Sequence, residues 1–152
     1  MVHVVFCDDK EKVLEKIMAG QRTMVIRGAA GRKIPHSRVF EGETLYFMKK
    51  GTGRVTAMAT VKAVQNYVKL ADQEIRTVLE EHQNKLCLTD KEKTRWHKKC
   101  LCVVEFENIK EMSSPLAFDH QGNMDDWLII EKIEDVIVGT SIQFNYEKSR
   151  LT

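Results

Sequence analysis

The strictest pattern in this sequence is an alternation between residues 55 and 63. Small apolar residues occupy every second position of this segment, at Val55, Ala57, Ala59, Val61 and Ala63. Successive side chains of a β-strand point to opposite faces of the sheet, so the alternation predicts a long strand with one buried face. We expect this strand to lie in the centre of a sheet, which excludes an all-helical bundle.

Other segments fit the same architecture. Short β-branched and aromatic runs predict further strands at Val2–Cys7, Thr23–Arg27, Thr44–Met48, Cys100–Phe106, Leu128–Ile130 and Ile142–Tyr146. Apolar residues at helical spacing predict helices at Lys10–Ala19, Ala71–Asn84 and from Thr89 to about His97. Residues 136–138 fit either a strand or a helix. Asp8 with Glu11, and Thr89 with Glu92, have the spacing of capping boxes, and Gly20 suits the left-handed end of the first helix.

These elements predict an α+β fold, a partly closed β-barrel of about six strands with helices packed outside it. The strand at Cys100–Phe106 should be central, like the alternating strand, and Val13, Leu14 and Ile17 should pack the first helix onto the barrel. A chain of 152 residues fits one domain, so we expect a single domain over residues 1–152. That length buries enough surface to fold without disulfides or metals.

Charge is unevenly distributed along the chain. The net charge is +2, but residues 22–54 hold eight basic and two acidic residues, a net charge of +6. Residues 105–135 hold two basic and nine acidic residues, a net charge of −7. No apolar segment is long enough to cross a membrane, and no secretory signal is apparent. We therefore expect a cytoplasmic protein whose four cysteines are reduced.

Four segments, in this order, resemble a known domain. Residues 17–27 combine a helix ending in glycine, a basic residue two positions later and a strand that carries an arginine. Residues 41–47 place Gly and an acidic residue before an apolar strand, and residues 55–64 form a strand of small residues. Residues 103–106 form a closing strand, and Ile109 and Pro115 lie in the segment that follows it. Together these segments resemble ASCH-type domains, a branch of the PUA-like superfamily.

The resemblance implies a function in handling RNA or modified bases. PUA-like domains bind such ligands; some ASCH proteins act as ribonucleases, and one bacterial type hydrolyses an acetylated cytidine. In that type a Lys occupies the basic position and a Thr follows three residues later, whereas this sequence has Arg22 and Val25. Arginine stays charged and cannot act as a neutral base, and valine has no hydroxyl. Acetylcytidine hydrolysis is therefore not expected, and the sequence favours binding over catalysis.

The basic window supplies the candidate binding residues. Arginine and lysine side chains neutralise phosphates, and an aromatic ring can stack on a base. The predicted nucleic-acid-binding residues are Arg22, Thr23, Arg27, Arg32, Lys33, Arg38 and Tyr46. Of these, Arg22 and Arg27 should anchor the ligand, because they flank a strand, while the loop residues supply diffuse attraction. The alternative is a solvated basic surface, with Tyr46 or Phe47 in the core.

Three functional hypotheses remain open at this stage. The leading one is a module that binds RNA or a modified nucleotide. The second is a ribonuclease or a hydrolase of modified nucleosides. The third is a protein-interaction domain whose basic segment meets an acidic partner.

Other motifs are weaker. Cys100 and Cys102 share a strand face near His97 and Cys87, but Cys-x-Cys is not the usual zinc spacing, and we expect no metal. Residues 28–31 read Gly-Ala-Ala-Gly but lack a full phosphate-loop pattern, so we expect turns and no cofactor. The alternative is a looser backbone cradle for one phosphate.

No spacing pairs a catalytic base with a nucleophile. The residues considered for such a role are His36, His82, His97 and Glu74. The pair Asp125 and Asp126 fits a turn before a strand better than a cation site.

Overall fold

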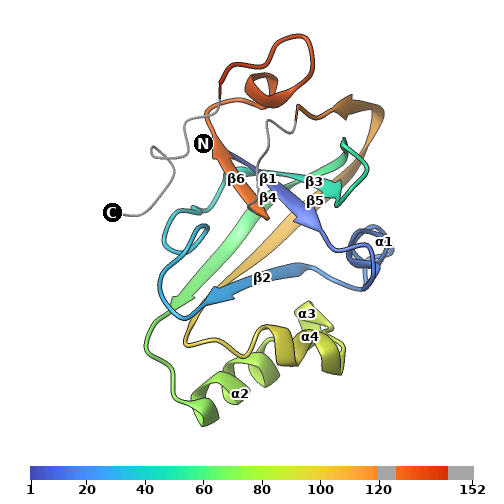
Figure 1. Ribbon diagram of the computed structural model, residues 1–152. Helices are drawn as coiled ribbons and strands as arrows, with labels where there is room; N and C mark the ends of the chain where they lie inside the picture. The colour runs from blue at the N-terminus through green and yellow to red at the C-terminus, as the bar shows by residue number, and fades with distance from the viewer. Residues whose placement is uncertain (120–125, 144–152) are drawn as a thin grey trace.

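The computed structural model describes residues 1–119 and 126–143. Six strands form one mixed sheet, and short helices lie between them (Figure 1). The strands are β1 (Val2–Cys7), β2 (Met24–Ala29), β3 (Thr44–Lys49), β4 (Arg54–Tyr67), β5 (Cys100–Ala117) and β6 (Trp127–Ile130). The helices are α1 (Val13–Met18), α2 (Asp72–Glu81), α3 (Gln83–Leu86), α4 (Asp90–Arg95) and a 3₁₀ helix, η1 (Ile133–Val136).

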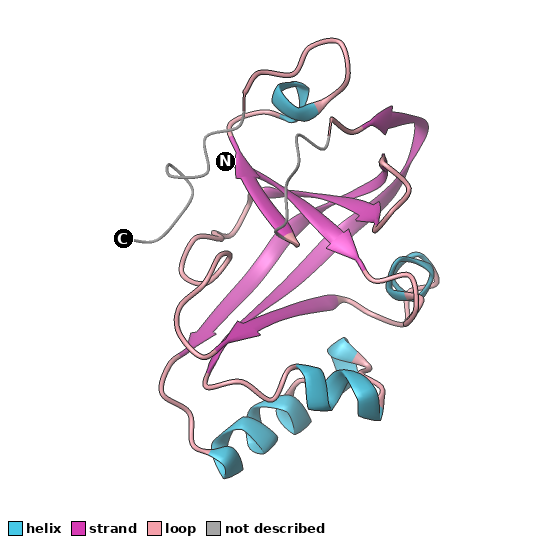
Figure 2. Cartoon of the chain, viewed as in Figure 1, coloured by secondary structure: helices cyan, strands magenta, loops and turns pink. Residues whose placement is uncertain are grey.

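The sheet is a curled half-barrel with strand order β2-β5-β4-β3-β1-β6 (Figure 2). Only β1 and β3 pair in parallel; the other neighbours are antiparallel. The two long strands β4 and β5 are interior, as the alternating pattern of residues 55–63 predicted. The predicted α+β half-open barrel is thereby confirmed. The edge strands β2 and β6 leave the barrel open on one side.

The concave face of the sheet holds the main core. Alternate residues of β1, β3, β4 and β5 point inward, and Phe47 and Phe106 pack with ring centroids 5.2 Å apart. Leu14 and Ile17 bury one face of α1 against this core, with Val13 at its margin, as predicted.

Two smaller clusters cover the convex face. Helices α2, α3 and α4 lie along β2 in Figure 1, where Ile75, Leu79 and Trp96 pack against Met24 and Leu101. The remaining cluster joins β1, β3 and β6 to η1. Of the described residues, none belongs to a helix long and apolar enough to span a membrane.

Several predicted boundaries are wrong. Helix α1 begins at Val13 rather than Lys10, because Lys12 adopts a left-handed φ of 54° and ends the preceding turn. The expected capping box of Asp8 and Glu11 does not form; the Glu11 carboxylate instead accepts a hydrogen bond from Thr89 Oγ1 at 3.0 Å. The capping box of Thr89 and Glu92 is confirmed.

The other differences concern the ends of elements. The φ of 77° at Gly20 confirms its left-handed conformation. Residues 71–84 split into α2 and α3, and β5 continues well beyond Phe106. Of the strand predicted at Ile142–Tyr146, Ile142 and Gln143 are not in a strand, and residues 144–146 lie outside the described residues.

Candidate functional site

A cleft opens between edge strand β2, the end of β1 and helix α4. It contains two adjoining cavities, an inner one of about 330 Å³ and an outer one of about 300 Å³. Four residues line both cavities and therefore form the wall between them, namely Arg27, Arg95, Trp96 and Asp126. Strand β6 begins at Trp127, opposite Val5, so its register with β1 covers Val2–Val5 and stops before the last two residues of β1.

Arg27 holds the centre of the cleft. Its Nη2 donates to the carbonyl oxygen of Phe6 at 2.7 Å, and its Nη1 donates to the carbonyl oxygen of Ile26 at 2.8 Å. The first bond ties edge strand β2 to the open end of β1. The guanidinium carbon lies 5.5 Å from the ring centroid of Trp127 and 5.7 Å from that of Trp96. Two backbone acceptors and two indole rings therefore fix this cation.

The charge of Arg27 is poorly compensated. Burial lowers the pKa of its guanidinium, because desolvation disfavours the charged form. Its Nε is buried without a hydrogen-bond partner in the described part of the chain. None of the ion pairs among residues 1–119 and 126–143 includes Arg27. The charge of Asp126 partly opposes the lowered pKa of Arg27. A partly buried cation that is held by carbonyls and rings, without an ion-pair partner, attracts an anion.

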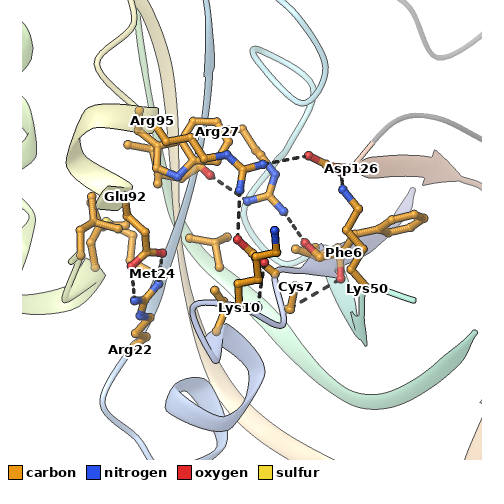
Figure 3. Close-up of a pocket in the computed structure, with 18 residues that line it drawn as sticks. Phe6, Cys7, Lys10, Arg22, Met24, Arg27, Lys50, Glu92, Arg95 and Asp126 are labelled. Atoms are coloured by element: carbon orange, nitrogen blue, oxygen red, sulfur yellow. Dashed lines mark hydrogen bonds and ion pairs between the residues drawn. The ribbon is translucent and has the colours of Figure 1, made fainter. Parts of the chain in front are cut away.

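The mouth of the cleft carries a network of ion pairs (Figure 3). Arg95 lies over the ring of Trp96, 4.7 Å from its centroid, and pairs with both Asp8 and Asp126 at 3.3 Å. Asp126 also pairs with Lys50 at 3.2 Å. These contacts join α4 to the ends of β1 and β6 and set the width of the opening.

The inner cavity ends at a buried ion pair. Arg22 and Glu92 are 4% and 5% exposed, and Arg22 Nη1 donates to Glu92 Oε2 at 2.8 Å while Nη2 donates to Oε1 (Figure 3). The pair lowers the pKa of Glu92 against the opposing effect of burial, so the carboxylate stays ionised. The charged residues Asp8, Lys10 and Lys50 also line this cavity. Its apolar lining residues are Val5, Val13, Met24, Val25, Ile26, Leu86 and Leu88.

One thiol, that of Cys7, lines the inner cavity. Burial raises the pKa of Cys7 to about 12, and the charge of Arg27 only partly offsets this effect. The side chain is therefore a protonated thiol at neutral pH, which is a poor nucleophile.

The cleft unites some of the predicted binding residues and leaves others outside. Arg22 and Arg27 line the inner cavity, and Arg27 and Lys33 line the outer one. Thr23, Arg32 and Arg38 line neither cavity. Tyr46 packs beside the cluster under η1, and Phe47 is buried in the main core, so neither ring lines the cleft. The assignment of all seven residues to nucleic-acid binding stays a prediction.

The sequence did not predict the cleft residues that come from α4, from the turn after it and from β6. Arg95, Trp96 and Lys98 come from α4 and the turn after it, and Trp127 comes from β6. A signal was present, since residues 91–99 read Lys-Glu-Lys-Thr-Arg-Trp-His-Lys-Lys, a basic run around an aromatic residue. Nothing local, however, shows that this run lies against β2.

The remaining candidates lie outside the cleft. No group of three or more His, Cys, Asp or Glu side chains within residues 1–119 and 126–143 could hold a metal ion. His97 pairs with Asp72 at 3.2 Å, and His36 contacts the carbonyl oxygen of Tyr67 at 3.0 Å. The expected turn residue Asp125 lies outside the described residues, whereas its neighbour Asp126 anchors the mouth of the cleft.

Comparison with solved structures shows what this architecture is. The crystal structure of the ASCH protein from Zymomonas mobilis matches 86% of this chain over 87% of its own length, with a TM-score of 0.61 and 10% sequence identity. The chain has the PUA-like ASCH fold. Two point-mutant forms of the Zymomonas protein, one serine-to-alanine and one tyrosine-to-phenylalanine, match 86% of the chain over 88% and 90% of their lengths. Both have TM-scores of 0.62, at 11% and 13% identity.

The ASCH resemblance in the sequence is thus confirmed at the level of the fold. No protein-family model matches the sequence, and no curated protein matches it. At identities of 10–13% the comparison shows the fold and not the chemistry, so the chemistry of this chain has to be inferred from its own cleft.

Proposed function

We propose that this chain binds RNA or a modified nucleotide, and that one nucleotide enters the cleft between β1, β2 and α4. The observation that carries the proposal is Arg27, a partly buried cation that forms no ion pair with the described residues and lies near the rings of both Trp96 and Trp127. Aromatic rings and guanidinium planes are the groups on which unpaired bases stack. The association of the ASCH fold with RNA and nucleosides supports this choice of ligand.

The size and charge of the cleft agree with such a ligand. The two cavities together suit a heterocyclic base with its sugar and phosphate better than a single small ion. The inner wall combines apolar side chains, which suit a base face, with charged ones, and the outer wall carries Arg27, Lys33, Arg95 and Lys98 against the single acid Asp126. A ligand with an apolar ring and an anionic group matches both walls.

Hydrolysis of RNA or nucleosides finds less support. Cys7 is protonated, and the Glu92 carboxylate already accepts hydrogen bonds from Arg22 and from the backbone N–H of Thr89. An engaged carboxylate and a raised thiol pKa leave neither group free as base or nucleophile. Binding without turnover is the function that the cleft supports best.

The chain offers a built-in reporter for this test. Its two tryptophans are Trp96 and Trp127, and both line the cleft, so occupancy should change intrinsic fluorescence directly. Titration with single-stranded RNA at low salt should quench the signal saturably, and the affinity should fall as salt rises. The recovered RNA should be intact on a denaturing gel. The absence of any fluorescence change and of any retention would refute the proposal, and RNA fragments would replace it with the nuclease alternative.

A further inference from the structure

We infer that the outer cavity is a phosphate subsite, built for the phosphomonoester of a nucleotide whose base enters the inner cavity. This inference rests on the proposed function and goes further, because it specifies a terminal phosphate rather than a nucleoside or an internal stretch of RNA. Free mononucleotides and the phosphorylated end of an RNA chain carry the same group.

The first argument is the number of cations without partners. The outer cavity is lined by four cations and one acid, and that acid, Asp126, pairs with Arg95 at 3.3 Å. Lys33 and Lys98 form no ion pair with any described residue, and neither does Arg27. Three cations around one cavity without an ion pair to a described residue match a phosphomonoester, which carries close to two negative charges at pH 7, better than a singly charged internal phosphodiester.

The second argument is that Arg27 is positioned before any ligand arrives. Its contacts with Phe6 and Ile26 use two of its N–H donors, and the buried Nε has no partner in the described chain. A guanidinium held in place presents its remaining donors as a rigid fork, a geometry that suits phosphate oxygens. An arriving anion would also compensate the desolvated charge of Arg27.

The third argument is the close approach of the backbone at Gly28. A Cβ at this position would lie 2.7 Å from Leu101 Cδ2, 3.0 Å from the carbonyl oxygen of Cys100 and 3.1 Å from Lys98 Cβ. The absence of a side chain therefore lets β2 pack directly against the residues after α4. This packing places the stem of Lys98 beside the strand that carries Arg27, on the same cavity.

The position of the outer cavity links the phosphate to the base. Arg27 and Trp96 line both cavities, so a group bound by the cations lies next to the inner cavity and its apolar side chains. A ribose is long enough to connect a phosphate on one side of Arg27 with a base on the other. A free phosphate ion would fill only the outer half of the cleft.

The direct test compares nucleosides with nucleotides. Tryptophan fluorescence and calorimetry would be measured with the four ribonucleosides, their 5′-monophosphates and inorganic phosphate. At least one 5′-monophosphate should bind ten-fold or more tightly than its nucleoside and than inorganic phosphate. Equal binding of nucleoside and nucleotide would overturn the phosphate subsite while leaving nucleotide binding intact. If neither nucleotides nor RNA bind, the proposed function itself fails.

A second comparison separates the two sources of the phosphate. A short RNA with a 5′-phosphate should bind more tightly than the same RNA with a 5′-hydroxyl if the ligand is a chain end. If the free mononucleotide binds and both RNAs bind weakly, the ligand is a free nucleotide, which also supports the subsite. Equal, tight binding of both RNAs would overturn the inference, because internal phosphates would then suffice.

A neighbouring residue provides a matched control variant. Lys33→Ala and Lys98→Ala should each weaken the 5′-monophosphate several-fold and leave the nucleoside unaffected. Lys99→Ala removes an exposed cation next to Lys98 that does not line the outer cavity, and it should change neither affinity. All three side chains are exposed, so these variants should fold normally. Equal losses in Lys98→Ala and Lys99→Ala would show a diffuse basic surface rather than a subsite.

Discussion

Trp127 donates its indole N–H to Nδ1 of His3, with 3.0 Å between the two nitrogens. The other ring nitrogen of His3, Nε2, lies 2.9 Å from Oε1 of Glu43, whose second oxygen pairs with the amine of Met1 at 3.1 Å. His3 is fully buried, so its hydrogen bonds decide its protonation state. Nδ1 accepts and Nε2 donates, which defines a neutral imidazole that fixes one indole of the cleft.

This arrangement predicts a loss of stability in mild acid. Burial lowers the pKa of His3 below its ordinary value of about 6.5, although Glu43 opposes the shift. Between the two pKa values the unfolded chain binds more protons, so the free energy of unfolding should fall as pH drops below about 6.5. His82, whose pKa burial also lowers, adds to this trend.

The measurement is urea unfolding at several pH values from 7.5 to 5. His3→Gln keeps hydrogen-bonding capacity without a titrating group, so its stability should depend less on pH than that of the parent. Its stability at pH 7.5 should not exceed the parent's, since the amide reproduces the imidazole geometry imperfectly. Parallel pH profiles for the two proteins would contradict the role assigned to His3.

The buried pair of Arg22 and Glu92 predicts that the loss of one partner destabilises the fold. Removing one partner leaves an uncompensated buried charge, which typically costs about 3–5 kcal/mol. Arg22→Ala should therefore lower the free energy of unfolding by roughly that amount, measured by urea denaturation. Arg22→Ala combined with Glu92→Gln should recover part of the loss, because no charge then remains unpaired. If Arg22→Ala is as stable as the parent, the ion pair contributes little to the fold.

Gly28 predicts a steric effect on both fold and cleft. Gly28→Ala would force its new methyl group against Leu101 and the backbone of Cys100, and overpacking of this kind costs about 1–3 kcal/mol. The variant should also bind nucleotide more weakly. Gly31→Ala is the matched control, since a Cβ there meets nothing within 4 Å, and its stability should stay within about 0.5 kcal/mol of the parent. Equal thermal midpoints for the two variants would contradict the close packing of β2 on β5.

The cysteines predict a simple labelling pattern. Of the four free thiols, Cys87 is exposed, whereas the others are buried, and burial raises the pKa of both Cys7 and Cys102 to about 12. A thiol reagent at pH 8 should modify one cysteine quickly and the remaining three only after denaturation. Cys87→Ser should abolish the fast reaction. Rapid labelling of Cys7 in the folded protein would show that its thiol is activated and would reopen the catalytic alternative.

The sequence predicted the sheet better than it predicted the cleft. Period-two alternation is local, so the long strand at Val55–Ala63 could be anticipated. The partner of Arg22 could not, because Glu92 is 70 residues away and already belonged to a predicted capping box. Trp96 and Trp127 reach Arg27 only through the pairing of β2 with β5 and of β1 with β6, which residue spacing does not encode.

Substitution of Arg27 should reduce ligand affinity strongly while changing the free energy of unfolding little. Its cation is partly buried and forms no ion pair with the described residues, so Arg27→Met removes a charge that Asp126 compensates only in part. The variant also places a flexible apolar side chain near two indole rings. Both changes should stabilise the fold, whereas the loss of the hydrogen bonds to Phe6 and Ile26 should destabilise it. We expect a free energy of unfolding within about 1 kcal/mol of the parent, together with a loss of at least ten-fold in affinity for RNA or nucleotide.

Arg27→Lys tests whether a positive charge alone is enough at this position, because it keeps the charge and loses the planar fork. It should retain more affinity than Arg27→Met and less than the parent. Lys110→Ala, an exposed cation on β5 outside both cavities, should bind like the parent. Unfolding curves and binding isotherms measured on the same preparations would decide the matter. A variant Arg27→Met that binds as the parent does would remove this arginine from the site, and one that fails to fold would assign it a structural role instead.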